Sequence, residues 1–324
     1  MCTAVCCGCY FGRNLDLEYG YDETVTITPR NYPIHFRRLP PLKNHYAMIG
    51  MATVSDGYPL YYEATNEYGL SIAGLNFPKS ACYQPEKPGL DNVTPFEMIP
   101  WILGQCRTTK EARKLLLRLN PVNIPFSDAF PLSPLHWIIA DENEAIVAEP
   151  MAGGLRIFDN PIGVLTNEPP FDYHLYNLSN YLNVSADPAE NRFSRGFELK
   201  SFSNGQGGFG LPGDYASPSR FVRAAFVKLN SVSTDVNQFF HILASVAMPR
   251  GAVRLAAGKY EITRYSCCCD TNRGIYYYTT YENSRITGID MFEEDLEGST
   301  PIAYPLLVSS QILKQNQKKD GNSQ

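Results

Sequence analysis

The chain begins Met1-Cys2-Thr3-Ala4, so a cysteine directly follows the initiator methionine. Cysteine is small enough for the methionine to be removed, and Cys2 would then carry a free α-amine and a thiol on one residue. Nucleophiles served by their own N-terminal amine are a known variant of the nucleophile–base pair, and they need no base from elsewhere in the chain. Taken alone, these four residues also fit the start of a buried strand, which is the more common case.

A short segment, FGRNLD at residues 11–16, follows closely. The residues before it are apolar and contain Gly8, which predicts a tight hairpin that returns Arg13 and Asp16 to the neighbourhood of Cys2. An arginine beside a thiol favours the nucleophilic thiolate. A carboxylate beside the α-amine can orient it, and with a reference pKa of about 8 the amine is poised for proton transfer at neutral pH. The alternative is an ordinary surface ion pair between Arg13 and Asp16.

The composition is that of a well-buried globular protein. Of the 324 residues, 44% are hydrophobic and 19% are charged, which excludes a disordered chain. The formal net charge of −5 argues against general nucleic-acid binding. No stretch has the length of a membrane span and no signal peptide opens the chain, so we expect no membrane association and a cytoplasmic location. The nine cysteines, an odd number, are expected to be free thiols.

Hydrophobic patterning predicts two groups of strands with pairs of helices between them. Strands are predicted within residues 3–13, 23–29, 46–54, 60–77, 135–158 and 260–291. Helices are predicted to begin at Thr94, at Thr108, at Ser217-Pro218, and after Thr234 as a cap. This order favours an α+β fold in which two antiparallel sheets pack face to face with helices outside. We expect one domain over residues 1–324, with a polar tail from about residue 315.

The sequence resembles the choloylglycine hydrolase family, which contains the bile salt hydrolases and the penicillin V acylases. The resemblance runs over nearly the whole chain, from the first four residues to the block at 274–283. It is carried by ordered blocks at residues 11–16 (FGRNLD), 27–31 (ITPRN), 73–77 (AGLNF), 164–167 (VLTN), 210–214 (GLPGD) and 219–221 (SRF). These proteins are N-terminal-nucleophile hydrolases, so the resemblance implies a four-layer αββα sandwich and the removal of Met1.

The resemblance also implies a catalytic set, consisting of Cys2, Arg13, Asp16, Asn76, Asn167 and Arg220. Cys2 would be the nucleophile and its freed amine the general base, with Arg13 and Asp16 positioning and activating it. Amide hydrolysis passes through tetrahedral intermediates, whose negative charge is stabilised by fixed neutral donors. The side chain of Asn167 and the backbone N–H of Asn76 would be these donors, and Arg220 would complete the polar cluster.

Several of these residues have an ordinary structural alternative. Asn76 could be a turn residue at a strand end, and Asn167 could cap a helix or turn. Arg220 lies one turn into a predicted helix, where it could form a buried ion pair. The five histidines form no evident dyad, and His136 lies in an apolar strand, where we expect a satisfied core residue and not a base.

Within the family, the sequence is more similar to the bile salt hydrolases of Gram-positive gut bacteria, because Asn76 stands where penicillin acylases more often have tyrosine. The resemblance therefore implies hydrolysis of the amide that joins a bile acid to glycine or taurine. It implies no cofactor and no metal, and it suggests a homotetramer.

A steroid substrate needs a broad apolar pocket with a few polar anchors. By their position in the sequence, four residues are candidates to line it: Leu15, Phe126, Phe130 and Leu135. Residues 123–134, which are rich in proline and phenylalanine, are expected to form a loop over the site. The alternative is that these four side chains belong to the core.

Two other functions stay open. The first is an acylase for penicillin V or N-acyl-homoserine lactones with the same mechanism. The second is a non-catalytic metal-binding protein, because the tip of the first hairpin reads Cys6-Cys7-Gly8-Cys9, where relatives usually have a longer hairpin with a polar tip. A zinc site needs four ligands, and the cluster 267–269 is expected in a strand, where adjacent cysteines point to opposite faces. We therefore expect no metal site.

Overall fold

The computed structural model describes residues 1–316, and the chain opens with the hairpin that the sequence predicts. The hairpin consists of β1 (Cys2–Cys7) and β2 (Tyr10–Leu17). Gly8 turns the chain with a φ of +58°, in the left-handed region that glycine adopts without steric cost. The register places Cys2 opposite Leu15, and Ala4 opposite Arg13. These four side chains therefore share one face, so the short hairpin keeps Arg13 on the same side as Cys2.

The hairpin belongs to a seven-stranded antiparallel sheet, called here the first sheet. Its strand order is β12-β1-β2-β14-β15-β16, and β13 pairs with β14. The further strands of this sheet are β12 (Val164–Leu165), β13 (Val253–Arg254), β14 (Tyr260–Asp270), β15 (Ile275–Thr280) and β16 (Thr287–Asp290). Strands from both ends of the chain thus meet at β2 and β14. The antiparallel pairing of β14, β15 and β16 confirms the strands predicted within residues 260–291.

The second sheet has eight strands, in the order β11-β10-β9-β6-β5-β4-β3-β17. Their bounds are β3 (Thr24–Thr28), β4 (Met48–Ser55), β5 (Tyr58–Asn66), β6 (Ser71–Asn76), β9 (Leu135–Ala140), β10 (Ala145–Met151), β11 (Gly154–Asp159) and β17 (Ile302–Pro305). Every pairing in it is antiparallel. A separate parallel pair consists of β7 (Asp91–Val93) and β8 (Leu119–Pro121).

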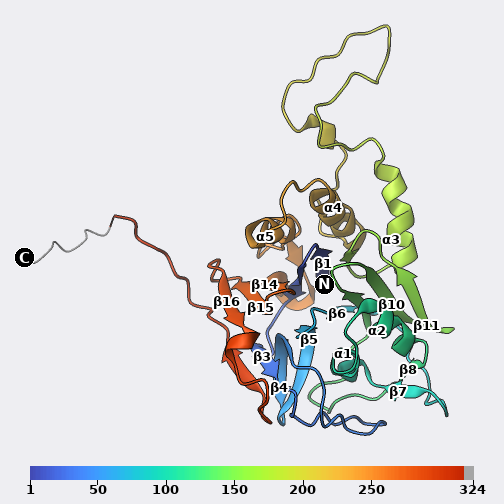
Figure 1. Cartoon of the computed structure of the whole chain (residues 1–324). Coiled ribbons are helices and arrows are strands. Elements are labelled where there is room, and N and C mark those ends of the chain that lie inside the picture. The colour runs from blue at the N-terminus through green and yellow to red at the C-terminus, as the bar shows by residue number, and fades with distance from the viewer. Residues whose placement is uncertain (317–324) are drawn as a thin grey trace, which may run out of the picture.

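Helices cover the outer faces of the two sheets, as Figure 1 shows. The helices are α1 (Met98–Leu103), α2 (Thr109–Leu116), α3 (Phe171–Asn177), α4 (Ser217–Leu229) and α5 (Val236–Ala244). Helices α1 and α2 lie on the second sheet, whereas α4 and α5 lie over β1, β2 and β14 of the first. The layers therefore follow the order helix, sheet, sheet, helix, which confirms the predicted αββα sandwich.

The predicted helix starts are correct with one exception. Thr94 donates its backbone N–H to the Glu97 carboxylate (2.9 Å), and a 3-10 turn at residues 95–97 leads into α1. Thr108 caps α2 as expected. The prediction of Thr234 as the cap of α5 is wrong by one residue, because the carboxylate of Asp235 accepts the N–H of the first turn. A charged acceptor interacts more favourably with the helix N-terminus than a hydroxyl does.

The main hydrophobic core lies between the two sheets and continues under α4 and α5. A second core packs α1 and α2 against the outer face of the second sheet. As predicted, Cys267, Cys268 and Cys269 are buried residues of a strand, β14. Within residues 1–316, no helix is long and apolar enough to cross a membrane. Most of the predicted polar tail lies outside the described residues.

One segment leaves the body of the molecule. Residues 182–213, called here the arm, follow α3 and its 3-10 extension and project away from the layers before the chain returns to α4 (Figure 1). Large apolar side chains of the arm are exposed: Leu182, Phe193, Phe197, Leu199, Phe202 and Phe209.

Candidate active site

Cys2 lies at the start of β1, with its side chain in the space between the sheets and only 3% exposed. Its backbone N–H donates to Oδ1 of Asn167 (2.8 Å), and its carbonyl accepts from Nη1 of Arg220 (2.6 Å). Met1 precedes it, with its amine donating to the carbonyl of Asp16 (2.7 Å) and paired with Glu261. While Met1 is present, the nitrogen of Cys2 is an amide and has no basic lone pair.

Arg13 is fully buried on the same face of the first sheet as Cys2. Its Nη1 donates to the carbonyls of Gly74 (2.7 Å) and Tyr62 (3.1 Å), and it lies 3.6 Å from Oε2 of Glu63. Its Nε and Nη2 have no hydrogen-bond partner within the described residues. Burial opposes the charged form, but Cys2 and then Tyr265 and Glu63 raise the pKa of Arg13 overall. Arg13 is therefore a permanent cation in the wall that holds the thiol.

Asp16 lies on the opposite face of β2, because it lies three positions after Arg13 and side chains alternate along a strand. Its Oδ1 accepts from the hydroxyl of Thr263 (2.6 Å), and its Oδ2 lies 4.0 Å from Nη1 of Arg220. Burial raises the pKa of Asp16, although Arg220 and the chain amine oppose this. The alternative of a surface ion pair between Arg13 and Asp16 is wrong, since both are buried and face opposite sides.

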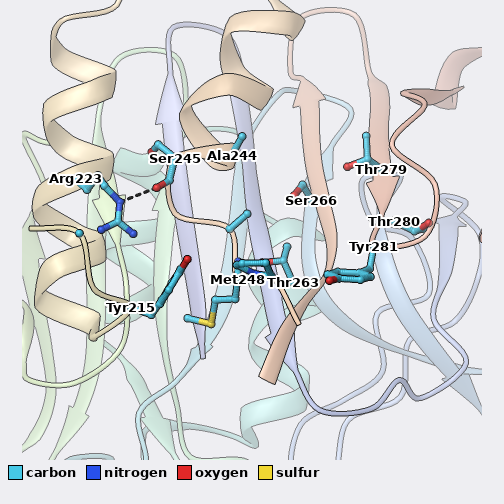
Figure 2. Close-up of a pocket in the computed structure, with 13 residues that line it drawn as sticks. Tyr215, Arg223, Ala244, Ser245, Met248, Thr263, Ser266, Thr279, Thr280 and Tyr281 are labelled. Carbon is cyan, nitrogen blue, oxygen red and sulfur yellow. Dashed lines mark hydrogen bonds between the residues drawn. The ribbon is translucent and has the colours of Figure 1, made fainter. Parts of the chain in front are cut away.

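Thr263 also connects Asp16 to a cavity on the helix-covered face of the first sheet. This cavity, of about 540 Å³, lies between α4, α5, β14 and β15, and Figure 2 shows Thr263 in its wall near Met248. The Thr263 hydroxyl accepts the backbone N–H of Met248 (2.8 Å) while it donates to Asp16. The Asp16 carboxylate is therefore held by Thr263 of the neighbouring strand β14, whose hydroxyl is fixed by Met248 after α5, whereas Arg13 is held from the second sheet.

Arg220 and Asn167 surround the backbone of Cys2 from α4 and from the end of β12. Arg220 donates to the hydroxyl of Thr3 (2.5 Å), to the Cys2 carbonyl, and through Nη2 to Oδ1 of Asn167 (2.7 Å). Burial lowers the pKa of Arg220, which Asp16 and Cys2 oppose. Asn167 is not the cap of α3, because Pro170 occupies that position. The side-chain oxygen of Asn167 thus accepts from Cys2 and Arg220, and its NH₂ group is free to donate to another acceptor.

The amide group of Asn167 donates to the carbonyl of Asn76 (2.7 Å) at the end of β6. Phe77 donates to the carbonyl of Pro134 (2.7 Å), and in an antiparallel ladder hydrogen-bonded and non-hydrogen-bonded pairs alternate. The N–H and C=O of Asn76 therefore point away from β9, toward the side where the pairing of β6 with β5 ends at Ala73. The N–H of Asn76 consequently lies on the same side as Asn167.

A cavity of about 330 Å³ opens between the sheets at Cys2. Both Cys2 and Arg13 line it, together with Asn76 and many apolar side chains. The four predicted pocket residues all line it: Leu15, Phe126, Phe130 and Leu135. Residues 124–126 and 129–134 form one wall, as expected for a loop over the site. The cavity lies within the range of small-molecule pockets, of about 300–1,000 Å³.

The other residues that the sequence singled out lie elsewhere. His136 is buried, with Nδ1 3.0 Å from the Glu149 carboxylate and Nε2 2.9 Å from the Thr166 carbonyl, which confirms it as a satisfied core residue. All nine cysteines, which lie within the described residues, are free. Within residues 1–316, no three His, Cys, Asp or Glu side chains are placed to hold a metal ion.

The comparison with known protein families agrees with this geometry. A model of the linear amide C–N hydrolases of the choloylglycine hydrolase family matches residues 2–304. The chain belongs to the choloylglycine hydrolase family. The bile salt hydrolase/transferase of Lactiplantibacillus plantarum is 51% identical over 98% of this chain and 100% of its own length. The bile salt hydrolase/transferase of Clostridium perfringens is 39% identical over 91% of this chain and 92% of its own.

Solved structures show the same relationship for the choloylglycine hydrolase fold. A mutant of the conjugated bile acid hydrolase from Clostridium perfringens superposes with a TM-score of 0.92 and 37% identity, over 98% of this chain and 100% of that one. The penicillin V acylase from Agrobacterium tumefaciens superposes with a TM-score of 0.73 at 19% identity, over 96% of this chain and 94% of that one. At that identity, the second likeness concerns the fold alone.

In this choloylglycine hydrolase, sequence reasoning missed part of the polar surroundings of the site. Thr263 and Glu63, which contact Asp16 and Arg13, come from distant strands. The pairing of β14 with β2 places Thr263 beside Asp16, and the packing of the two sheets places Glu63 beside Arg13. Sequence reasoning also missed several cavity residues: Leu17, Tyr21, Tyr62, Phe96 and Ile99. A signal existed for Leu17, because it lies two residues after Leu15 and therefore on the same face of β2.

Proposed function

We propose that this enzyme hydrolyses the amide bond of glycine- or taurine-conjugated bile salts, releasing free bile acid and the amino acid. The observation that carries the proposal is the position of Cys2 in the wall of a mainly apolar cavity, beside the cation of Arg13. The substrate class is supported by 51% identity to the bile salt hydrolase/transferase of Lactiplantibacillus plantarum over nearly the whole chain. The apolar part of the cavity would hold the steroid, which places the amide at Cys2.

The first step requires the removal of Met1. The freed amine of Cys2 takes the proton of its own thiol, and the thiolate attacks the carbonyl carbon of the amide. A C–S bond forms and the carbonyl electron pair moves onto oxygen. Arg13 favours the thiolate electrostatically, and Asp16, on the other face of the sheet, orients the amine and its proton.

The negative oxygen of the tetrahedral intermediate is proposed to lie between Asn167 and Asn76. One N–H of the Asn167 amide is engaged by the Asn76 carbonyl, which leaves the second N–H for the oxyanion. The backbone N–H of Asn76, directed away from β9, is the other donor. Arg220 fixes the oxygen of Asn167 and so prevents the amide from turning over. Loss of one such donor typically costs about 10²–10³ in rate.

Collapse of the intermediate breaks the C–N bond, and the ammonium of Cys2 gives its proton to the departing nitrogen. The bile acyl group is then held on Cys2 as a thioester. Water, which loses a proton to the same amine, attacks this thioester. The second tetrahedral intermediate collapses to the free bile acid as the C–S bond breaks, and the Cys2 thiolate that leaves takes back the proton from the amine. No metal ion or organic cofactor takes part in either half of the reaction.

A second activity follows from the same thioester. An amino acid with a free amine can attack in place of water, and the acyl group would then pass to that amine with formation of a new amide. The names of the relatives from Lactiplantibacillus plantarum and Clostridium perfringens include transferase beside hydrolase. We therefore propose acyl transfer as an accompanying reaction of this enzyme.

The substrate proposal is tested by amino-acid release from glycocholate and taurocholate, measured beside hydrolysis of penicillin V and of an N-acyl-homoserine lactone. We expect kcat/KM for at least one conjugated bile salt to exceed both other values by about 10-fold or more, because a cavity shaped for a steroid discriminates between acyl groups. Faster hydrolysis of penicillin V or of the lactone would assign the enzyme to the acylase alternative. No hydrolysis of any of them, with zinc bound to the purified protein, would favour the metal-binding alternative.

We also propose that the protein is a homotetramer whose subunits hold one another through the arm. Exposed aromatic side chains are rarely clustered on the surface of a monomer, and the arm carries Phe193, Phe202 and Phe209 with 84–85% of each side chain exposed. A loop that projects from the body can reach a neighbouring subunit (Figure 1). Burial of these rings in an interface would offset the cost of ordering the arm.

Replacement of Phe193, Phe202 and Phe209 by serine is expected to convert the tetramer into smaller species, because the buried apolar area of the interface is lost. Light scattering after gel filtration would measure the mass of each species. The matched control replaces Leu117 and Val232, which are 74% and 102% exposed but lie outside the arm. A wild-type monomer, or a serine variant that keeps the full tetramer mass, would contradict the proposal.

We also propose that the protein is located in the cytoplasm. Nine free thiols are typical of proteins that stay in a reducing compartment, and five of these cysteines are buried with no disulfide partner within the described residues.

A further inference from the structure

The carboxylate of Glu63 is an ionisable group that the proposed mechanism does not use. Glu63 lies in β5 and is 1% exposed. It accepts hydrogen bonds from the hydroxyls of Tyr276 (2.6 Å) and Tyr265 (2.8 Å) and a longer contact from the thiol of Cys267 (3.5 Å). Its only cationic neighbour within residues 1–316 is Arg13, 3.6 Å away. Burial raises the pKa of Glu63, and Arg13 is the largest influence that opposes this.

These contacts engage only one nitrogen of the Arg13 guanidinium. Nη1 is fixed by the carbonyls of Gly74 and Tyr62 and by the charge of Glu63. Nε and Nη2 have no partner within the described residues, although they are buried and Arg13 lines the cavity with Cys2. Buried guanidinium donors without a partner are unusual, because each one costs the desolvation energy of the group. The free donors are therefore the ones available to a thiolate or to the substrate.

We propose that Glu63 is a positioning residue that acts through Arg13. Its carboxylate, which is fixed by two tyrosine hydroxyls, holds Nη1 at the base of the cavity and thereby keeps Nε and Nη2 directed toward Cys2. The inference rests on the proposed function in one respect, since it takes Arg13 as the group that favours the Cys2 thiolate. A purely structural role for Glu63, as the acceptor of two buried tyrosines, makes a different prediction.

The test is Glu63→Gln, which keeps the shape and an acceptor oxygen but removes the charge. If Glu63 holds Arg13, the guanidinium is released in this variant, and the midpoint of Cys2 alkylation by iodoacetamide shifts to higher pH. If Arg13 stays in place without Glu63, the thiolate gains net positive surroundings, and the midpoint shifts to lower pH. Tandem mass spectrometry assigns the label to Cys2. An unchanged or lowered midpoint overturns the proposal.

A kinetic measurement adds a second readout. We expect kcat/KM of Glu63→Gln to fall by up to about 10²-fold, the usual cost of displacing a catalytic group by about 1 Å. In an Arg13→Met background, the same substitution should change kcat/KM by no more than a factor of about two, the ordinary scatter of additive variants. Equal losses in both backgrounds would show that Glu63 does not act through Arg13, and would overturn the proposal.

Two further variants complete the design. Tyr265→Phe removes the hydroxyl that donates to Oε2, the oxygen nearest Arg13, and it should shift the alkylation midpoint in the same direction by a smaller amount. It replaces Glu63→Gln if that variant does not fold. Glu67→Gln removes another ion-paired carboxylate, four residues further along the chain and bonded to Arg30, and should leave both readouts unchanged. Because alkylation needs no substrate, the result is independent of whether bile salts are hydrolysed.

Discussion

Replacement of Cys2 by alanine is expected to lower kcat/KM for conjugated bile salts by about 10⁴-fold or more, the usual effect of removing a catalytic nucleophile. The side chain supplies the thiol that attacks the amide, and no other group in the proposed mechanism can replace it. The variant should fold, because the local contacts of residue 2 with Asn167 and Arg220 are made by its backbone N–H and carbonyl. Alanine at this position also still permits the removal of Met1, so the α-amine is retained.

The measurement is amino-acid release from glycocholate and taurocholate, with thermal unfolding as the check on the fold. Cys82→Ala is the matched control, since Cys82 is an exposed free thiol outside the cavity, and it should keep full activity. Activity of Cys2→Ala within about 10-fold of the wild type would show that the reaction does not proceed through a thioester on Cys2.

The position of Cys2 and its near neighbours could be predicted from the sequence because they depend on local structure. A hairpin with Gly8 at its turn fixes the register, and the register places Arg13 on the same face as Cys2. Because side chains alternate along a strand, Asp16 then lies on the other face. This alternation can be read from the sequence, but the ion-pair alternative did not take it into account. Asn167, by contrast, could be assigned only through the resemblance to a family.

The surroundings of these residues could not be predicted, because they depend on contacts between distant strands. Glu63 reaches Arg13 from the second sheet, and Thr263 reaches Asp16 across a pairing of β14 with β2 that contains a bulge next to Thr263. A shift of one residue at that bulge would turn Thr263 away from Asp16. Residue patterns within one strand carry no information about such a register. The exposed arm could not be predicted either, because its apolar residues suggest burial.

Extension of the chain by one alanine between Met1 and Cys2 is expected to lower kcat/KM by about 10²–10⁴-fold, the range for loss of a general base. After removal of Met1, the new alanine would be the first residue and the nitrogen of Cys2 would remain an amide. An amide nitrogen cannot take the thiol proton or return it to the leaving group. The thiol itself is unchanged, so this variant separates the amine from the nucleophile.

The extended chain should fold, because the structure already holds a residue in front of Cys2. The Met1 amine donates to the Asp16 carbonyl, and the Cys2 N–H donates to Asn167, so an alanine in that place can make the same contacts. Intact mass must show that wild type has lost Met1 and that the variant keeps one additional alanine. Iodoacetamide should still label Cys2 in the variant. Loss of hydrolysis together with retained labelling would identify the α-amine as the base. Full hydrolysis by the extended chain would require another group to take the proton, for example the Asp16 carboxylate, whose pKa is raised by burial.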